Sequence, residues 1–252
     1  MPKRSASIRP AAARSAAARS AATRSARARP AAARKASPAP ASARPVAWRE
    51  HLERLRDCRL CPQVQPPSVV GAVPGASIYL VGQAPGPREV KLGRPFAWTA
   101  GRTMFGWFAS LGVDEAMFRS RVYMAAVISC FPGRLPGKTG DRRPSRQEVE
   151  TCRVHRETEL ELLRPALVLP VGRMAIELFM PCPSLEAVVG RQFRGAPNGH
   201  ACDVIPLPHP SGLSRWIQTP QGKTSIRQAL ALIGAHPAWQ RTFPEAEPAA
   251  LD

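Results

Sequence analysis

The feature of this sequence that most constrains its fold is an alternation of short apolar runs with segments of helical spacing. Such an alternation predicts a parallel β-sheet covered by helices, an α/β architecture. The runs are rich in Val and Ile, as strands are. Four strands are expected, at residues 77–83, 122–130, 166–172 and 203–208.

The segments between these runs carry apolar residues at helical spacing. Ser145 is the expected N-cap of one helix, with Glu148 three residues on completing a capping box. The predicted helices span residues 48–56, 100–111, 145–163, 174–179 and 225–235.

Unusual sequence follows three of the predicted strands. Parallel sheets place their working loops at the carboxyl ends of the strands, so we expect the functional site there. The three strings are Gly82-Gln83-Ala84-Pro85-Gly86, Cys130-Phe131-Pro132-Gly133 and Pro208-His209-Pro210-Ser211-Gly212.

Charge divides the chain into a basic arm and a nearly balanced body. Residues 1–49 hold twelve of the 36 Lys and Arg residues and no acid, whereas the remaining 203 residues hold 24 basic and 18 acidic residues, a net charge of +6. Residues 1–45 are mainly Ala, Arg, Ser and Pro, so we expect a disordered arm. Residues 46–236 form the expected domain, and residues 237–252 an irregular tail.

The arm has four interpretations. Six arginines recur every five residues from Arg9 to Arg34, which scatters them around a helix and gives no amphipathic stripe. This argues against a membrane-surface helix and a transit peptide. A solubilising tail remains open, and so does non-specific attachment to the phosphates of DNA or RNA.

The body is long enough for one domain with a full core. It has no apolar run of membrane-spanning length, and the N-terminus lacks a secretory signal. We therefore expect no membrane partner and a reducing compartment: not secreted, and cytoplasmic near the nucleoid if the source is bacterial. Oligomeric state is not encoded in any motif, and a monomer is the simplest expectation.

Six cysteines in such a chain favour metal ligands or free thiols over disulfides. Structural zinc usually takes two close pairs of thiolates, whereas a cubane cluster takes one thiolate per iron, which suits one close pair and two isolated cysteines. A role as small buried apolar residues is the alternative, and it fits Cys182 and Cys202 best. The metal-ligand candidates are Cys58, Cys61, Cys130 and Cys152.

Residues 50–218 resemble the iron-sulfur branch (families 4 and 5) of the uracil-DNA glycosylase superfamily. The resemblance rests on the first and second sequence motifs of that superfamily, which begin at Gly82 and Leu207, and on the spacing of the four cysteine candidates. The motif residues are Gly82 to Gly86, Glu89, Gly93-Arg94-Pro95-Phe96, Ala100-Gly101-Arg102, the run from Pro144 to Glu148 before Cys152, and Leu207-Pro208-His209-Pro210-Ser211.

The resemblance implies a three-layer α/β/α sandwich with a central, mainly parallel four-stranded sheet. It also implies a structural 4Fe-4S cluster on the four cysteine candidates. His209 would donate to the carbonyl of the base, Phe96 would stack on the base, and backbone around Gly82, Gln83 and Ala84 would line the pocket. Two further roles follow, a phosphate contact by Ser211 and a wedge by Leu213.

Three departures from the family pattern affect these roles. Gln83 stands where Glu is usual, so the water-guiding acid is best sought at Glu89. Ala126 stands near a strand Asn of the uracil-specific relatives, which indicates a pocket that accepts several deaminated bases. The segment 133–143 is basic and has no His, so covalent capture of DNA is not expected. Its Arg134, Lys138, Arg142 and Arg143 suit either a DNA-backbone contact or a solvated insertion.

The leading hypothesis is a DNA repair glycosylase that flips a deaminated base, uracil foremost, out of DNA and hydrolyses its N-glycosidic bond, which initiates base excision repair. The alternative is a non-cleaving nucleic-acid-binding protein that retains the glycosylase fold and the cluster.

Overall fold

The computed structural model describes residues 44–247 except 136, 138–139 and 213. The predicted arm, residues 1–45, therefore lies outside the described residues apart from its last two, which begin helix α1 (Arg44–Asp57). Most of the predicted tail is described. None of the helices in the described part of the chain combines the length and the apolar character that crossing a membrane requires.

The sheet has five strands in the order β2-β1-β3-β5-β4. All neighbouring pairs are parallel except β4 with β5. The four predicted strands are confirmed, with shorter bounds, and a fifth was missed. The bounds are β1 Ile78–Gly82, β2 Tyr123–Ala126, β3 Leu167–Pro170, β4 Phe193–Gly195 and β5 Cys202–Val204.

The expectation of four strands is thus wrong by one edge strand. Strand β4 has only three residues, none of them fully buried, so it leaves no apolar run in the sequence. Its Arg194 pairs with Asp203 of β5 at 2.8 Å between Nη1 and Oδ1. A short, charged edge strand of this kind is a common way to end a sheet.

Each predicted helix has a helical counterpart of different extent. Beyond α1, the bounds are α2 Pro87–Leu92, α3 Thr99–Ala109, α4 Glu115–Arg121, α5 Arg146–Thr151, α6 Arg153–Leu163, α7 Arg173–Ile176, α8 Leu185–Val188, α9 Pro220–Ala235 and α10 Pro237–Thr242, with 3-10 turns η2 Pro197–Gly199 and η3 Arg215–Gln218. Of these, α2, α4, α8 and α10 were not predicted.

Two predictions about helices need correction. The single helix expected over residues 145–163 is two, α5 and α6, which meet at Cys152. The tail expected to be irregular contains α10, because Trp239 and Phe243 pack into the apolar core. The capping box is confirmed: the Ser145 hydroxyl accepts from the Glu148 amide at 3.2 Å, and the Glu148 carboxylate accepts from the Ser145 amide at 2.7 Å.

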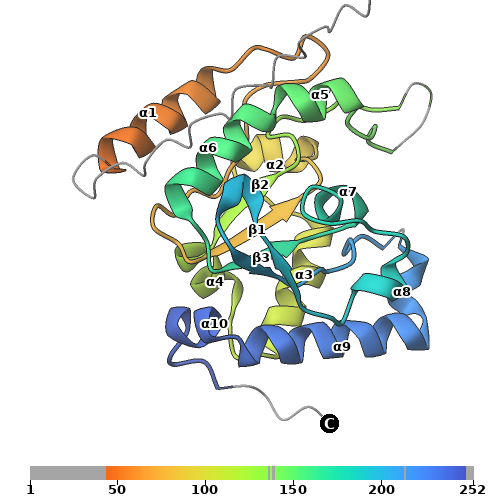
Figure 1. Cartoon of the computed structure of the whole chain (residues 1–252). Helices are drawn as coiled ribbons and strands as arrows, with labels where there is room; N and C mark the ends of the chain where they lie inside the picture. The colour runs from red at the N-terminus through yellow and green to blue at the C-terminus, as the bar shows by residue number, and fades with distance from the viewer. Residues whose placement is uncertain (1–43, 136, 138–139, 213, 248–252) are drawn as a thin grey trace, which may run out of the picture. The chain divides into compact units, whose positions relative to one another are not determined.

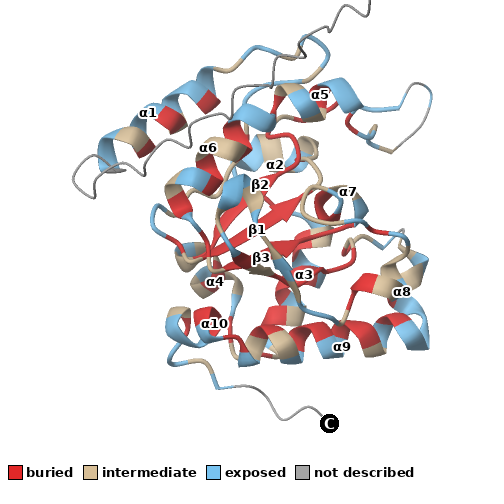
Figure 2. Cartoon of the chain, viewed as in Figure 1, coloured by how far each residue is buried: buried red, intermediate tan, exposed pale blue. Residues whose placement is uncertain are grey.

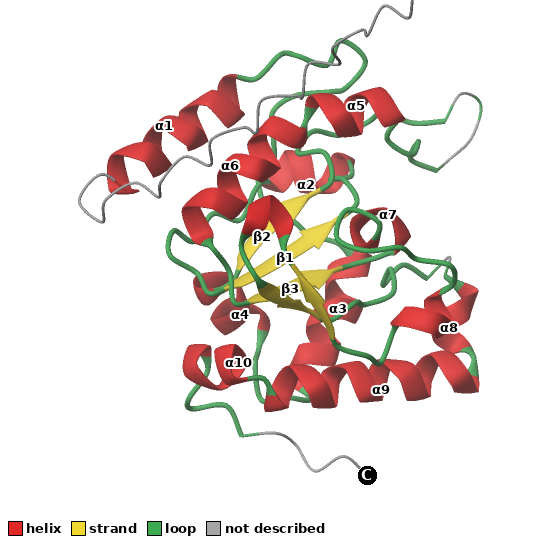
Figure 3. Ribbon diagram, viewed as in Figure 1, coloured by secondary structure: helices red, strands yellow, loops and turns green. Residues whose placement is uncertain are grey.

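Alternate residues of β1, β2 and β3 enter two separate cores, which makes the fold a three-layer sandwich. Tyr79 and Val81 of β1 pack with residues of α1 and α6. Ile78 and Leu80 point to the other face and pack with residues of α3, α4, α9 and α10. Figures 1 and 3 show these two sets of helices on opposite sides of the sheet, and Figure 2 shows the strands buried between them. The predicted α/β/α architecture is confirmed.

Candidate active site and cysteine cavity

A cavity of about 500 Å³ opens at the carboxyl ends of the parallel strands. Strand β1 has β2 on one side and β3 on the other, so the cavity lies where the connections of the sheet diverge, the usual ligand site of such folds. Leu213 falls outside the described residues. The remaining predicted catalytic and base-binding residues all line the cavity: Gly82, Gln83, Ala84, Glu89, Phe96, His209 and Ser211.

Phe96 is held in the cavity wall by two glycines. A Cβ at Gly82 would stand 2.7 Å from Cζ of the Phe96 ring, and a Cβ at Gly101 would stand 1.7 Å from the Phe96 carbonyl oxygen. The backbone of Phe96 has a φ of 50°, a left-handed conformation that is uncommon outside glycine. Arg119 stabilises this turn by donating to the carbonyl oxygens of Pro95 at 2.8 Å and of Phe96 at 3.0 Å.

His209 has a defined tautomer in its neutral form. Its Nδ1 accepts a hydrogen bond from the amide of Ser211 at 3.3 Å. A neutral imidazole carries one proton, so that proton is on Nε2, which is then a donor. Burial lowers the pKa of His209, which favours this neutral form.

The sheet fixes the position of His209 through Gly172, a residue that the sequence analysis did not single out. The amide of Gly172 donates to the carbonyl of Leu207 at 2.8 Å, which joins the end of β3 to the His209 segment. A Cβ at Gly172 would come within 3.2 Å of Cβ and 3.3 Å of Cδ2 of His209. Gly172 also has a φ of 85°, so a side chain there is disfavoured by both backbone and space.

Two carboxylates lie beside Gly86 in the cavity wall. The Glu89 carboxylate accepts from the Gly86 amide at 3.2 Å and so caps α2. A Cβ on Gly86 would stand 2.9 Å from Oε2 of Glu89 and 3.2 Å from Oδ2 of Asp141. Desolvation raises the pKa of Asp141, Arg134 opposes the rise, and the charge of Glu89 adds to it. Sequence reasoning missed Asp141 because it lies in the basic segment and has no motif around it.

Ala126, which stands near the strand Asn of the uracil-specific relatives, lies in the wall of the large cavity. It is the last residue of β2, is paired with Gly82 in the sheet, and lines the cavity. Its methyl group cannot hydrogen-bond to a ligand, which leaves this part of the wall without a side-chain donor or acceptor.

The basic segment divides into paired and exposed cations. Arg142 donates to both Glu148 oxygens, at 2.8 and 2.6 Å, and this pairing lowers the pKa of Glu148 to about 2. Arg142 is therefore engaged within the protein. Arg134 and Arg143 are exposed, and Lys138 lies outside the described residues.

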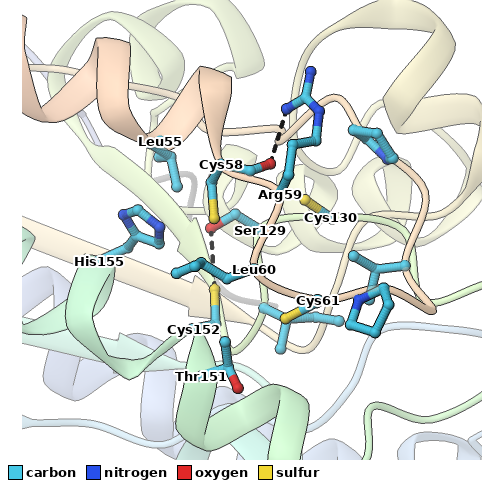
Figure 4. Close-up of a pocket in the computed structure, with 14 residues that line it drawn as sticks. Leu55, Cys58, Arg59, Leu60, Cys61, Ser129, Cys130, Thr151, Cys152 and His155 are labelled. Atoms are coloured by element: carbon cyan, nitrogen blue, oxygen red, sulfur yellow. Dashed lines mark hydrogen bonds between the residues drawn. The ribbon is translucent and has the colours of Figure 1, made fainter.

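A second cavity, of about 230 Å³, is lined by all four cysteine candidates (Figure 4). Cys58 follows α1, Cys61 lies three residues on, Cys130 follows β2, and Cys152 joins α5 to α6. None of the chain's six cysteines forms a disulfide. Cys182 and Cys202 are buried in the two apolar cores, as the alternative for them predicts.

The chemistry of this cavity fits a group with several metal atoms better than a single ion. In the described part of the chain, no three His, Cys, Asp or Glu side chains are grouped as ligands of one ion. A zinc ion would bring its sulfurs within about 3.8 Å of one another, whereas each iron of a cubane takes its own thiolate. Burial, and then the charges that the other three cysteines would carry as thiolates, raise the pKa of Cys130 to about 12, so a metal group bound here would have to displace the thiol proton. Nε2 of His155, also in the wall, is buried and has no partner among the described residues.

A buried polar cluster holds the helices around the cysteine cavity to the sheet. Glu159 of α6 is only 1% exposed and accepts from the hydroxyls of Tyr79 at 2.7 Å and Tyr123 at 3.0 Å. Nε2 of His51, on α1, stands 3.6 Å from the same carboxylate. These contacts fix α1 and α6 relative to β1 and β2.

One segment lines both cavities. Ser129 and Cys130 belong to the cysteine cavity, and Pro132 and Arg134 belong to the larger one. Just before them, the amide of Val127 donates to the carbonyl of Gly82 at 2.8 Å. The chain after β2 thus connects the cysteine cavity directly to the wall in which Gly82 and Phe96 meet.

The three-layer sandwich, the cavity at the strand ends and its half-buried histidine donor place the chain among the α/β enzymes that bind their ligand at the edge of a parallel sheet. The model of the Uracil DNA glycosylase superfamily matches residues 70–233, and the chain belongs to this superfamily.

The chain is similar to several type-4 uracil-DNA glycosylases, and the similarity extends over most of the length of each of the three described next. The chain is 27% identical over 173 residues to a type-4 uracil-DNA glycosylase of Pyrobaculum aerophilum, covering 65% of this chain and 82% of the relative. It is 29% identical over 172 residues to the type-4 enzyme of Archaeoglobus fulgidus, covering 64% and 80%. With the type-4 enzyme of Thermotoga maritima it shares 28% identity over 168 residues, covering 65% and 81%.

Proposed function

We propose that this chain is a DNA repair glycosylase that removes a deaminated base, uracil foremost, from DNA by hydrolysing its N-glycosidic bond. Superfamily membership and the names of the type-4 relatives support the reaction class. The observation that carries the proposal is the neutral His209 in the wall of the large cavity, with its proton on Nε2.

The cavity binds one base after the base has left the stack. Base excision requires such extrusion, because the glycosidic bond cannot be reached inside a duplex. The ring of Phe96, held against Gly82, supplies the stacking surface. Ala126 leaves the pyrimidine edge without an amide partner, so selection rests on shape and on the base carbonyl rather than on a full set of hydrogen bonds.

His209 stabilises the leaving base. As the glycosidic bond breaks, negative charge develops on the base and reaches its carbonyl oxygen. The Nε2 proton of His209 hydrogen-bonds to that oxygen, and the bond strengthens as charge accumulates. The amide of Ser211 keeps the tautomer that makes this donation possible.

Water reaches the sugar from the side of the carboxylates. The sugar acquires positive character in the transition state, which a nearby carboxylate stabilises while it orients and deprotonates the water. Glu89 is the proposed water-guiding acid, and Asp141 lies beside it over Gly86. The capping bond from the Gly86 amide fixes the Glu89 carboxylate without neutralising its charge.

The remaining contacts hold the strand. Ser211 binds a phosphate next to the flipped nucleotide, and Leu213 fills the space that the base leaves in the duplex. The target is DNA that contains deaminated bases, and the enzyme acts as a monomer in the cytoplasm, near the nucleoid in a bacterial cell.

The four cysteines of the second cavity hold a 4Fe-4S cluster. Bound there, the cluster cross-links the end of α1, the segment after β2 and the junction of α5 with α6. Its contribution is structural, since the cysteine cavity and the base cavity are separate.

The test is release of the base from oligonucleotides that carry uracil, hypoxanthine or xanthine, read as abasic sites. We expect uracil to be released, and His209→Ala to lower single-turnover cleavage at saturating enzyme about a hundredfold or more. His200→Ala is the matched control, because His200 precedes β5 at the opposite end of the sheet. Binding without release from any of the three substrates would instead support the alternative, a non-cleaving nucleic-acid-binding protein.

A further inference from the structure

An exposed tryptophan stands at the mouth of the large cavity. Trp98 lines the cavity, yet 47% of its surface is exposed, which is unusual for so large an apolar side chain. It occupies the N-cap position of α3 and makes no side-chain capping bond there. Its side chain belongs to neither apolar core and does not cap the helix, so the ring is available to a ligand of the cavity.

Two arginines lie against this ring. The guanidinium carbon of Arg88, on α2, is 4.6 Å from the ring centroid, and that of Arg102, on α3, is 5.8 Å from it. Both distances are within the range of cation–π attraction. Both arginines are exposed, and neither forms a salt bridge with any residue in the described ranges. The cations thus orient the ring while keeping their charge for another partner.

An exposed aromatic ring flanked by unpaired cations suits single-stranded nucleic acid. Bases stack on such rings whatever their identity, because every base has a π-face, and guanidinium groups meet the phosphates between the bases. A protein or lipid partner would require a wider apolar surface than one ring. Leu92, another exposed large apolar side chain, at the end of α2, does not line the cavity.

We propose that Trp98, with Arg88 and Arg102, is a second base-binding site, on which an unpaired base next to the flipped nucleotide stacks. The inference rests on the proposed function, because it concerns the DNA strand whose flipped base would occupy the cavity. One base would lie inside against Phe96 and its neighbour outside on Trp98. The consequence is a preference for uracil in single-stranded or locally unpaired DNA, where the neighbouring base is free to stack.

The experiment measures binding apart from cleavage. The full chain is titrated with a single-stranded thymine oligonucleotide without uracil, at one fixed salt concentration. The variants are Trp98→Ala, Trp98→Phe and the control Leu92→Ala. The chain has five tryptophans, so the emission of Trp98 is obtained by subtracting the fluorescence of Trp98→Phe from that of the wild type. Because Trp98 is exposed, thermal unfolding should be unchanged, which verifies that each variant is folded.

We expect Trp98→Ala to weaken binding on the order of 5- to 150-fold, the range for loss of one stacked base. Trp98→Phe keeps a ring and should stay within a few-fold of wild type, and the Trp98 fluorescence should be quenched on binding. Unchanged binding by Trp98→Ala, or an equal loss in Leu92→Ala, would overturn the proposal.

Cleavage assays on the same variants separate this inference from the function on which it rests. We expect Trp98→Ala to lose more activity on single-stranded than on fully paired uracil substrates. Equal losses on both substrates would contradict the stacking site while leaving the glycosylase intact. If no substrate is cleaved but the weaker binding of Trp98→Ala persists, the proposed reaction fails and the base-binding surface stands.

Discussion

The ring of Phe96 lies so close to Gly82 that a Cβ at position 82 would stand 2.7 Å from its Cζ. The two residues are 14 positions apart in the chain, and Gly101 receives the Phe96 carbonyl from the other side. Gly82 and Gly101 thus leave the room in which the ring of Phe96 is held at the end of β1.

Gly82→Ala should displace this ring. The backbone of Phe96 is held by Gly101 and Arg119, so only the ring can move, and we expect a destabilisation of about 1–3 kcal/mol together with weaker substrate binding. Denaturant unfolding and KM on a uracil oligonucleotide measure the two effects. Gly106→Ala is the control: a Cβ there meets nothing within 4 Å, and Ala in this helix should stabilise by about 0.5–1 kcal/mol. Wild-type behaviour of Gly82→Ala would show that the ring is not confined.

The partial burial of His209 should make stability depend on pH. Its pKa in the folded protein lies below the ordinary value of 6.5, so between these two values the unfolded chain binds a proton that the folded chain does not. The free energy of unfolding should therefore fall as the pH drops below 6.5. His209→Asn has no imidazole to protonate at this position. From pH 7 to pH 5 the free energy of unfolding should therefore fall more for the wild type than for the variant. A difference independent of pH would contradict the burial.

Replacing the two cavity carboxylates by amides separates their roles. Glu89→Gln keeps an oxygen that can accept from the Gly86 amide, so α2 remains capped while the charge is lost. We expect it to lower single-turnover cleavage about a hundredfold, as loss of a general base does. Asp141→Asn should cost less. The reverse ranking in the same assay would assign the water to Asp141.

The cysteine cavity predicts a coloured protein. Purified without oxygen, the wild type should be brown and contain iron and inorganic sulfide, and Cys58→Ser should lose the colour and much of its solubility. Cys202→Ser is the control, since Cys202 is buried in the core away from the cavity, and it should keep its iron. A colourless, folded preparation that contains zinc would exclude the cluster.

The basic arm should act through charge alone. Deleting residues 1–43 removes ten Lys and Arg residues and leaves α1 entire. For each phosphate that the shortened protein no longer neutralises, the slope of log K against log salt should become shallower by about 0.9, so we expect weaker duplex binding, most of all at low salt. Single-turnover cleavage at saturating enzyme should be nearly unchanged. A truncated protein that binds fully but fails to cleave would contradict this division.

The layers and the central strands could be predicted from the sequence because their signals are local. A buried parallel strand such as β1 is a continuous apolar run, and the capping box at Ser145 involves residues three apart. Strand β4 and helix α10 could not be predicted in this way. The first exists through pairing with β5, and the second through the packing of Trp239 against distant aromatic rings.

The same distinction applies to the candidate site. His209, Phe96 and the cysteines stand in recognisable strings, and the structure brings them to two cavities. Gly172 and Asp141 act through contacts with residues 37 and 55 positions away, so no local pattern marks them. Trp98 lies between two strings of the recognised motif and was not singled out, and only the three-dimensional structure shows that it is exposed beside two cations.

The segment from Val127 to Arg134 lines the cysteine cavity with one end and the base cavity with the other. If the four cysteines hold the proposed cluster, its loss would therefore loosen the wall where Gly82 and Phe96 meet, although the two cavities are separate. A protein without that cluster would then keep every proposed catalytic side chain but hold the wall of its base cavity less firmly.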